Sequence, residues 1–253
     1  MLVALKLTLV PACLALLSLA ARAWGPRVAG WLAGLPIVAG PILLFISIER
    51  GVAFGALAAG AALGAACGTV WFCLAYAWTA TRHAWPLAAL AGISAWAGTI
   101  VLCSLFEGSV LPGTLATLVS LIIAGPLFPR RSVPAGAHLP RHEIFFRMVA
   151  GAIVVLLVTG VADAIGPVWS GLVSAFPTLG TVLAVFSQRA SGGAYAGALL
   201  RAMCLGMASL AAFFASLALL LPRLDVAAGF VASLAICLSV QWIAASVMRR
   251  AGA

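Results

Sequence analysis

The sequence predicts an all-α integral membrane protein with about nine transmembrane helices, arranged as an inverted 4+1+4 internal repeat. Of its 253 residues, 65% are apolar and only 8% are charged, whereas a soluble domain has roughly 45–50% apolar and about 25% charged residues. The apolar residues form runs long enough to cross a bilayer as helices. A pattern of glycines and prolines also recurs 141 residues along the chain. A soluble fold and a disordered chain are both excluded.

Turns and charged residues separate nine apolar runs, each long enough for a membrane helix. The first run ends at Ala21-Arg22-Ala23, which fits a signal-cleavage pattern. Because this run also belongs to the repeat, we expect it to be retained as a helix. The expected spans are 2–21, 28–48, 52–80, 85–105, 109–128, 144–164, 168–187, 193–221 and 226–247.

The basic residues predict how the chain is oriented. With nine spans, ten of the fourteen fall on one side of the membrane, three on the other, and Arg201 within a span. The positive-inside rule makes the richer side cytoplasmic. We therefore expect a bacterial inner (plasma) membrane protein with its N-terminus outside and its C-terminus in the cytoplasm, whose basic face contacts anionic lipid headgroups. The ten residues are Arg22, Arg27, Arg82, Arg130, Arg131, Arg141, Arg147, Arg189, Arg249 and Arg250.

The repeat predicts three parts: a first half over 1–106, a linking helix with a basic cytoplasmic loop over 107–142, and an inverted second half over 143–253. An odd number of spans separates the two copies, so they cross the membrane in opposite directions. Many secondary transporters share this pattern. The identical pairs at the spacing of 141 are Gly25/Gly166, Pro26/Pro167, Gly30/Gly171, Pro36/Pro177, Phe45/Phe186, Gly51/Gly192 and Ala53/Ala194.

Two repeated prolines predict interruptions near mid-membrane. Pro36 and Pro177 each follow a Gly-Pro pair by about ten residues, or about 15 Å at 1.5 Å per residue. A proline there frees a backbone carbonyl, which is tolerated only where protein or a watery cavity covers it. Ser174, Thr178 and Thr181 surround the second proline. We expect two broken helices to meet at a central binding site, with two ordinary kinked helices as the alternative.

Arg201 is the remaining candidate for substrate binding. It lies within a predicted span, where a charge costs about 2.5–3.5 kcal/mol on insertion scales and usually faces a cavity or partner. No acidic residue inside a span can pair with it. The alternatives are an anionic ligand and snorkelling toward lipid headgroups. Ser239 and Gln241 in the last span are expected to hydrogen-bond between helices.

The sequence excludes several other functions. It has no Walker, HExxH or GxSxG motif, so we expect no enzyme and no cofactor. His138 and His142 are spaced like metal ligands, but no cysteine or second carboxylate accompanies them, so we expect no metal. The basic residues lie between apolar runs without a basic-aromatic stripe, which excludes nucleic acid. The bilayer is the expected partner, and a homo-oligomer is left open.

The stretch Gly171 to Val185, GLVSAFPTLGTVLAV, resembles the GlpM-like small bacterial membrane proteins, which carry a Gly-Leu-x-x-x-Phe-Pro-Thr run in an early helix. Members of that family have about half this length, so the chain resembles a tandem fusion of two of them. The weaker copy, Gly30 to Leu44, has Leu-Pro-Ile in place of Phe-Pro-Thr. The resemblance implies a membrane protein of transport or envelope type without catalytic residues.

These features together predict a small inner-membrane transporter or exporter that works by alternating access. Its substrate is unidentified, and Arg201 favours an anionic solute or a lipid headgroup. The alternative is a non-transporting accessory or scaffold protein in envelope polysaccharide or lipid assembly. A polar cavity reaching mid-membrane would favour transport, whereas a dry interior would favour the scaffold.

Overall fold

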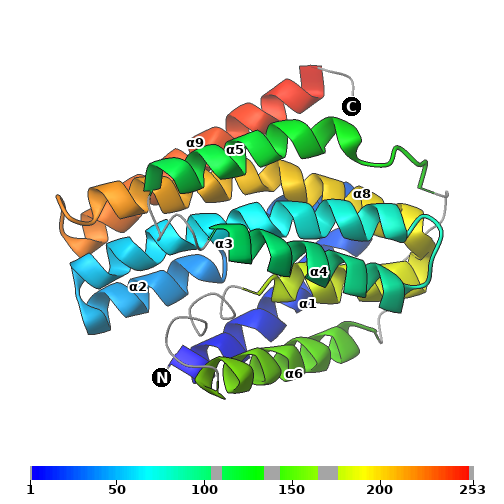
Figure 1. Ribbon diagram of the computed structural model, residues 1–253, viewed down its shortest axis with the longest axis horizontal. Coiled ribbons are helices and arrows are strands. Elements are labelled where there is room, and N and C mark those ends of the chain that lie inside the picture. Colours follow the sequence, from blue (N-terminus) through cyan, green and yellow to red (C-terminus); the bar gives the residue numbers. More distant parts are fainter. Residues whose placement is uncertain (1, 104–109, 134–142, 165–175, 251–253) are drawn as a thin grey trace.

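In the computed structural model the chain folds into helices that mostly follow the long axis of the molecule (Figure 1). The structure describes residues 2–103, 110–133, 143–164 and 176–250. Their regular secondary structure is entirely helical, which confirms the predicted class for these residues. The helices are α1 (Leu2–Ala33), α2 (Ala39–Arg50), α3 (Val52–Thr79), α4 (Trp85–Cys103), α5 (Val110–Leu127), α6 (Glu143–Ala164), α8 (Thr178–Leu220) and α9 (Val226–Arg250).

Six segments in the described part of the chain are long and apolar enough to cross a membrane. Their outer faces expose large hydrophobic side chains; on α5, for example, Leu111 is 70% and Ile122 74% exposed. Such surfaces are stable in lipid rather than in water, so this is a membrane protein. The count of nine stays a prediction, because part of the expected span 168–187 lies outside the described residues. The six segments are Leu7–Ala33, Val52–Thr79, Trp85–Cys103, Val110–Leu127, Thr178–Leu220 and Val226–Ala244.

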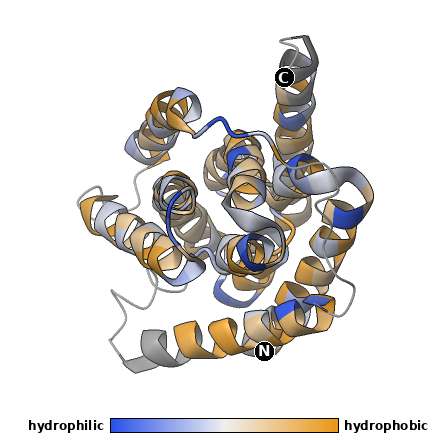
Figure 2. Ribbon diagram, turned by 90° about the vertical axis from the view of Figure 1, so that its right-hand side faces the viewer, coloured by the Kyte–Doolittle hydropathy of each residue, from blue (hydrophilic) through white to orange (hydrophobic). Residues whose placement is uncertain are grey.

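α3 and α8 form the interior of the helix bundle. They are the most buried of the membrane-length segments, with 67% and 56% of their most apolar stretches inside the molecule. α1 and α9 pack on α8, α4 packs on α3, and α5 contacts both central helices. The end-on view in Figure 2 shows this bundle along its helix axes. Anything bound inside the protein would therefore lie beside α3 and α8.

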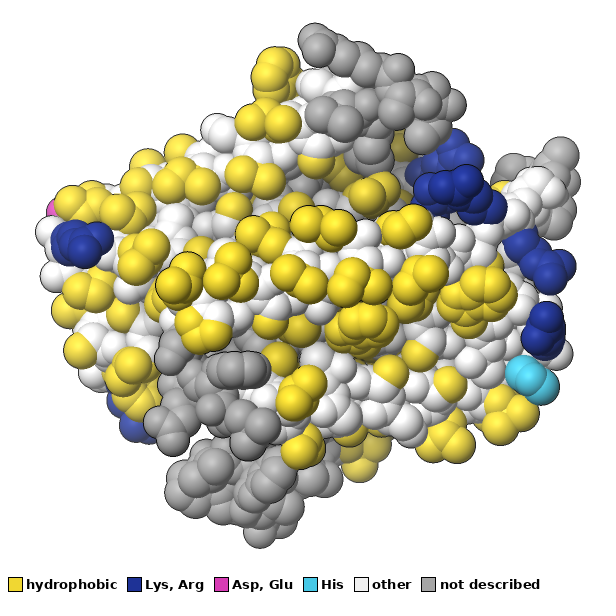
Figure 3. All heavy atoms as spheres, turned by 45° about the horizontal axis from the view of Figure 1, so that its top comes forward, with side chains coloured by type: hydrophobic (Ala, Val, Ile, Leu, Met, Phe, Trp, Pro, Cys, Tyr) yellow, Lys and Arg dark blue, Asp and Glu magenta, His cyan; other side chains and the backbone are white. Residues whose placement is uncertain are grey.

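Charged side chains gather at the two ends of the bundle, with a hydrophobic surface between them (Figure 3). The α3–α4 turn and the turn at Gly192 lie together at one end, where the Gln188 side-chain amide donates a hydrogen bond to the His83 carbonyl (2.8 Å). Arg82 and Arg189 belong to this end. The α2–α3 and α8–α9 turns lie at the opposite end (Figure 1). We take the two ends as the two membrane surfaces.

Single glycines reverse the chain between packed helices. Gly51 joins α2 to α3 with φ 90° and ψ 162°, and Gly192 divides α8 with φ 83° and ψ 171°. A Cβ would meet nothing within 4 Å at either position, so the glycine is required by this backbone conformation alone, which is essentially restricted to glycine. Each predicted loop is thereby reduced to one residue. Glu49 and Arg50, expected in a loop, belong to α2.

The predicted span over 28–48 is not one helix. α1, which turns at Gly25 (φ 84°), ends at Ala33, and α2 starts only at Ala39. The residues between them, Gly34–Val38, are non-helical; we call them the first break. Pro36 explains this, because it lacks an N–H and its ring clashes with the carbonyl four residues earlier. In this half the chain is fully interrupted, and the alternative of an ordinary kinked helix is wrong.

Helix boundaries recur at the spacing already visible in the sequence. Corresponding helices in the first half (1–106) and the second half (143–253) start, and in one case also end, 141 residues apart. The two halves therefore have the same succession of helices, and α5 stands between them. The equivalent bounds are Leu2 of α1 and Glu143 of α6, Val52–Thr79 of α3 and the 193–220 part of α8, and Trp85 of α4 and Val226 of α9.

Candidate functional site

The first break lies at mid-membrane depth. Gly34 packs so closely on Gly206 that a Cβ added to Gly34 would lie 2.5 Å from the Gly206 Cα. Gly206 is near the middle of the 193–220 part of α8 and far from both turns. Pro36 itself is buried. The sequence expectation of a break near the membrane centre therefore agrees with the packing of this segment.

Side chains from α8 and α9 bind the backbone that the first break frees. Gln241 of α9 donates from Nε2 to the Trp31 carbonyl (3.1 Å) and accepts at Oε1 from the Ser209 hydroxyl (2.5 Å). Gln241 and Ser209 are 2% and 1% exposed. An unpaired polar group in such a place costs about 1–3 kcal/mol, so these three groups stabilise one another. Ser239, in contrast, binds only the Ala235 carbonyl of its own helix.

The second break, Phe176–Pro177, directly precedes α8. The Thr181 hydroxyl donates to the Pro177 carbonyl (2.9 Å) and the Thr178 hydroxyl to the Phe176 carbonyl (3.4 Å). The Phe176 ring meets the edge of Trp96 in α4, with ring centroids 5.3 Å apart. The structure thus brings three of the predicted site residues, Pro177, Thr178 and Thr181, into one place.

Each break packs against the last helix of the other half. The first break contacts α9 through Gln241, and the second contacts α4 through Trp96. The helix pairs that carry these contacts meet at equivalent positions: a Cβ on Gly68 of α3 would touch two residues of α4, and Ser209 of α8 reaches two residues of α9. The equivalent residues, 141 apart, are Gly68 and Ser209, Trp96 and Cys237, and Ile100 and Gln241.

Two phenylalanines at the same spacing fill the space beside the helix starts. Phe213 in α8 faces Gly40 at the start of α2, and Phe72 in α3 faces Gly180 at the start of α8. Phe213 is 2% and Phe72 0% exposed. The two halves therefore place an identical side chain against equivalent backbone.

α2 and α8 both begin at a break, and no described side chain caps either start. The first N–H groups of a helix lack partners within it, and the helix dipole gives that end a partial positive charge. Val38 and Leu179, beside the two starts, pack against the same buried hydrophobic cluster. Two helix N-termini thus begin inside the protein, and such termini favour bound anions.

Arg201 does not share this place. It lies on the same face of α8 as Leu205 and Leu219, which are 40% and 49% exposed, whereas Gly206 faces α1. Within the described ranges no residue forms an ion pair or a hydrogen bond with Arg201. This position suits contact with lipid. Ser174, the other predicted site residue, lies outside the described residues.

Arg147 is the buried cation that sequence reasoning assigned only to a basic loop. Its side chain is 0% exposed. Nη2 lies 3.2 Å from Glu143 Oε2, Nη1 lies 3.5 Å from the Ser18 hydroxyl of α1, and the guanidinium lies 5.7 Å from the centre of the Phe186 ring of α8. Nε finds no partner in the described part of the protein. Arg147 therefore ties α6 to α1 and α8.

Two signals in the sequence could have identified Arg147. Glu143 and Arg147 are four residues apart, the spacing of an ion pair on one helix face. Lys6 stands 141 residues before Arg147, so each half carries a cation five residues into its first helix. A basic residue at an equivalent position in both halves belongs to the repeat rather than to the loop.

No protein family, curated protein or solved structure matches this chain. The resemblance to a tandem pair of GlpM-like proteins therefore stays a prediction based on its short motif, of which residues 171–175 lie outside the described part. The geometry of the breaks is the basis on which function can be inferred.

Proposed function

We propose that the protein is a small transporter of an anionic solute, built as an inverted repeat in a bacterial inner membrane. The observation that carries this proposal is the exchange of the breaks between halves: α9 holds the first through Gln241, and α4 holds the second through Trp96. A rotation of one half against the other would then move both breaks together. Alternating access around a fixed central site needs such coupling.

The backbone supports an anion as the solute. At the first break the exposed carbonyl is bound by Gln241, and at the second Thr178 and Thr181 bind the carbonyls. These contacts neutralise the acceptors and leave the N–H groups of the two uncapped helix starts as donors. Half-helix N-termini bind anionic substrate groups in other transporters of inverted-repeat design. In this proposal Arg201 contacts lipid headgroups.

The end of the bundle with Arg82, Arg147 and Arg189 is the cytoplasmic end in this proposal, following the positive-inside rule. The N-terminus is then outside and the C-terminus inside. Glu49 and Asp225, at the opposite end, face outward. This orientation makes the halves mirror each other across the membrane, as an inverted repeat requires.

Accessibility from both sides tests alternating access without knowledge of the solute. Val38→Cys and Thr178→Cys, beside the two helix starts, are labelled in right-side-out and inverted vesicles with a membrane-impermeant maleimide. We expect both sites to react from both sides, because the site opens alternately. Wild type measures the background from native cysteines, and Leu118→Cys on the lipid face of α5 is the matched control. Labelling from neither side would contradict the proposal and favour an accessory or scaffold protein.

Ligand-dependent thermal stability tests the class of solute. Wild type, Arg201→Ala and Gln241→Leu are heated in detergent with a panel of small organic and inorganic anions, since a ligand that binds only the folded state stabilises it. We expect at least one anion to stabilise wild type and Arg201→Ala equally. A shift lost only in Arg201→Ala would return that residue to the substrate site. No shift with any anion would contradict the anionic class.

A further inference from the structure

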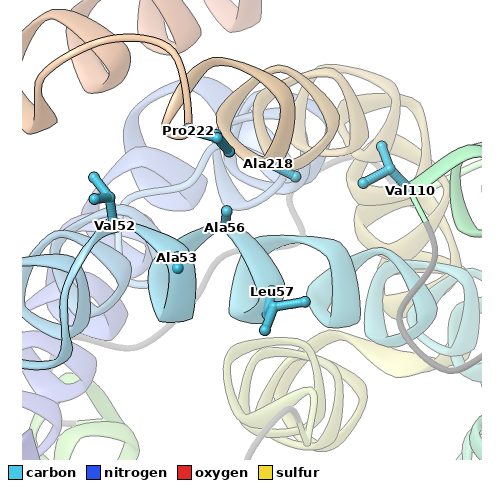
Figure 4. Close-up of a pocket in the computed structure, with 7 residues that line it drawn as sticks. All are labelled: Val52, Ala53, Ala56, Leu57, Val110, Ala218 and Pro222. Atoms are coloured by element: carbon cyan, nitrogen blue, oxygen red, sulfur yellow. The ribbon is translucent and has the colours of Figure 1, made fainter.

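A groove lies between the two halves at the end of the bundle opposite Arg189. Its volume is about 570 Å³. Val52, Ala53, Ala56 and Leu57 form its α3 wall (Figure 4).

The other walls are equally apolar. Val110 from α5 closes one side, and Ala218 and Pro222 from the end of α8 close the other. Leu57 is 69% and Val52 38% exposed, so the groove opens to the surroundings of the bundle. No lining side chain offers a hydrogen bond, which excludes a polar solute as the occupant. Along the bilayer-facing surface, the neighbouring medium that fits such walls is the acyl region of the membrane.

Two arginines stand at the membrane-surface end of this groove. Arg50 precedes Val52 by two residues and stacks over the Phe54 ring (5.7 Å), and Arg223 directly follows Pro222. Neither forms an ion pair with a carboxylate in the part of the chain that the structure describes. Of the two acids nearby, Asp225 accepts from the Ala228 N–H at the start of α9, and Glu49 lies beside Arg50 in sequence.

We propose that this groove binds one membrane phospholipid. The first part of an acyl chain lies against the α3 and α8 walls, where burial of its methylene groups is favourable. The phosphate lies at Arg50 and Arg223, since guanidinium groups match phosphate oxygens in charge and geometry. A free anion would not use the apolar walls, and an uncharged hydrocarbon would not use the arginines. The site is independent of transport, because it lies at the surface end of the bundle rather than at the breaks.

Native mass spectrometry of the purified protein tests the proposal. The protein is delipidated in detergent and titrated with phosphatidylethanolamine and with phosphatidylglycerol. We expect one tightly retained phospholipid on wild type. Ala56→Phe, which fills the groove, should weaken retention by about tenfold or more. Arg50→Gln and Arg223→Gln should each weaken it by about fivefold, the effect of one surface cation on an anionic headgroup.

Two matched controls separate this site from the general lipid surface. Ile122→Phe changes a lipid-facing residue of α5 that is 74% exposed, and Arg82→Gln removes an arginine at the opposite end. Both should retain the lipid as wild type does. If Ala56→Phe does not fold, the arginine variants alone decide. Equal retention by all variants, several lipids of equal affinity, or loss with the arginines but not with Ala56→Phe would each overturn the proposal.

Discussion

The two halves build their breaks on equivalent backbone but surround them with different side chains. In the second half, α8 and α9 supply Ser209 and Gln241, whose hydroxyl and amide bind the interrupted α1. At the equivalent positions α3 and α4 have Gly68 and Ile100, and Trp96 packs its ring on Phe176 instead. One break is held by hydrogen bonds and the other by an aromatic contact.

This difference separates what the backbone requires from what each side chain adds. The glycine turns and the interrupted helices recur in both halves, so they belong to the shared architecture. The buried polar groups Ser209, Gln241 and Arg147 belong to the second half alone. A symmetric motion of the halves would therefore act on an asymmetric interior, in which only one break must lose hydrogen bonds in order to move.

The largest effect is expected at the buried ion pair of α6. Glu143→Gln leaves the Arg147 guanidinium buried without a counter-charge, and breaking a buried pair in this way costs about 3–5 kcal/mol. The free energy of unfolding, measured by titration with a denaturing detergent in mixed micelles, should fall by about that amount. The first half has Leu2 and Lys6 at the corresponding positions.

The double variant Glu143→Gln/Arg147→Met is the control for this pair. It removes the buried charge and fills the space with an apolar side chain, which is often neutral. We expect it to recover most of the lost stability. A double variant as unstable as Glu143→Gln would show that Arg147 acts through packing rather than through its charge.

The next largest effect is expected where backbones touch. Gly206→Val would force its Cβ to 2.8 Å from the Gly34 Cα, and overpacking of this kind costs about 1–3 kcal/mol, occasionally more. Ala65→Val, the equivalent change in α3, should cost less, because that position already has a Cβ. Equal losses of unfolding free energy would mean that the α1–α8 contact is looser than the structure has it.

The glycine turns should respond alike in the two halves. Gly51→Ala and Gly192→Ala both place a Cβ on a backbone with φ near +85°, and such a conformation costs about 1–3 kcal/mol for a residue other than glycine. Both variants should lose similar stability in the same detergent titration. Gly98→Ala in the middle of α4, where a Cβ meets nothing, is the control and should be neutral or stabilising. Unequal losses at the two turns would break the equivalence of the halves.

The smallest effect is expected from the asymmetric pair itself. Gln241→Leu removes two hydrogen bonds, and in membrane proteins each is worth about 0.6 kcal/mol on average. We expect a loss of about 1 kcal/mol, whereas Ile100→Leu in the other half should stay within about 0.5 kcal/mol. A neutral Gln241→Leu would mean that the freed Trp31 carbonyl finds another partner.

Local chemistry made the backbone features predictable. Pro36 and Pro177 interrupt helices because of their own covalent structure, and Gly51 and Gly192 mark turns because no other residue adopts that conformation readily. Thr178 and Thr181 bind carbonyls within one turn of themselves. Each of these effects depends on neighbours close in the sequence, which a pattern can show.

The orientation of side chains could not be predicted in the same way. In a soluble helix the polar face marks the outside, but helices in this chain are apolar all round, so periodicity does not separate the lipid face from the buried face. Arg201 therefore looked like a buried site residue and lies on the outer face, while Arg147 is fully buried. The partner of Gln241, the Trp31 carbonyl, is 210 residues away.

The one-residue turns also govern how the chain can enter the bilayer during synthesis. α2 has 12 residues, or about 18 Å at 1.5 Å per residue, and is too short to cross the roughly 30 Å hydrocarbon core alone. Gly51 leaves no tether long enough for α2 and α3 to enter separately. The insertion machinery must therefore release them as one preformed hairpin, and the same holds for the two parts of α8. Assembly thus proceeds by hairpins, and each interrupted segment enters the membrane together with the long helix that follows it.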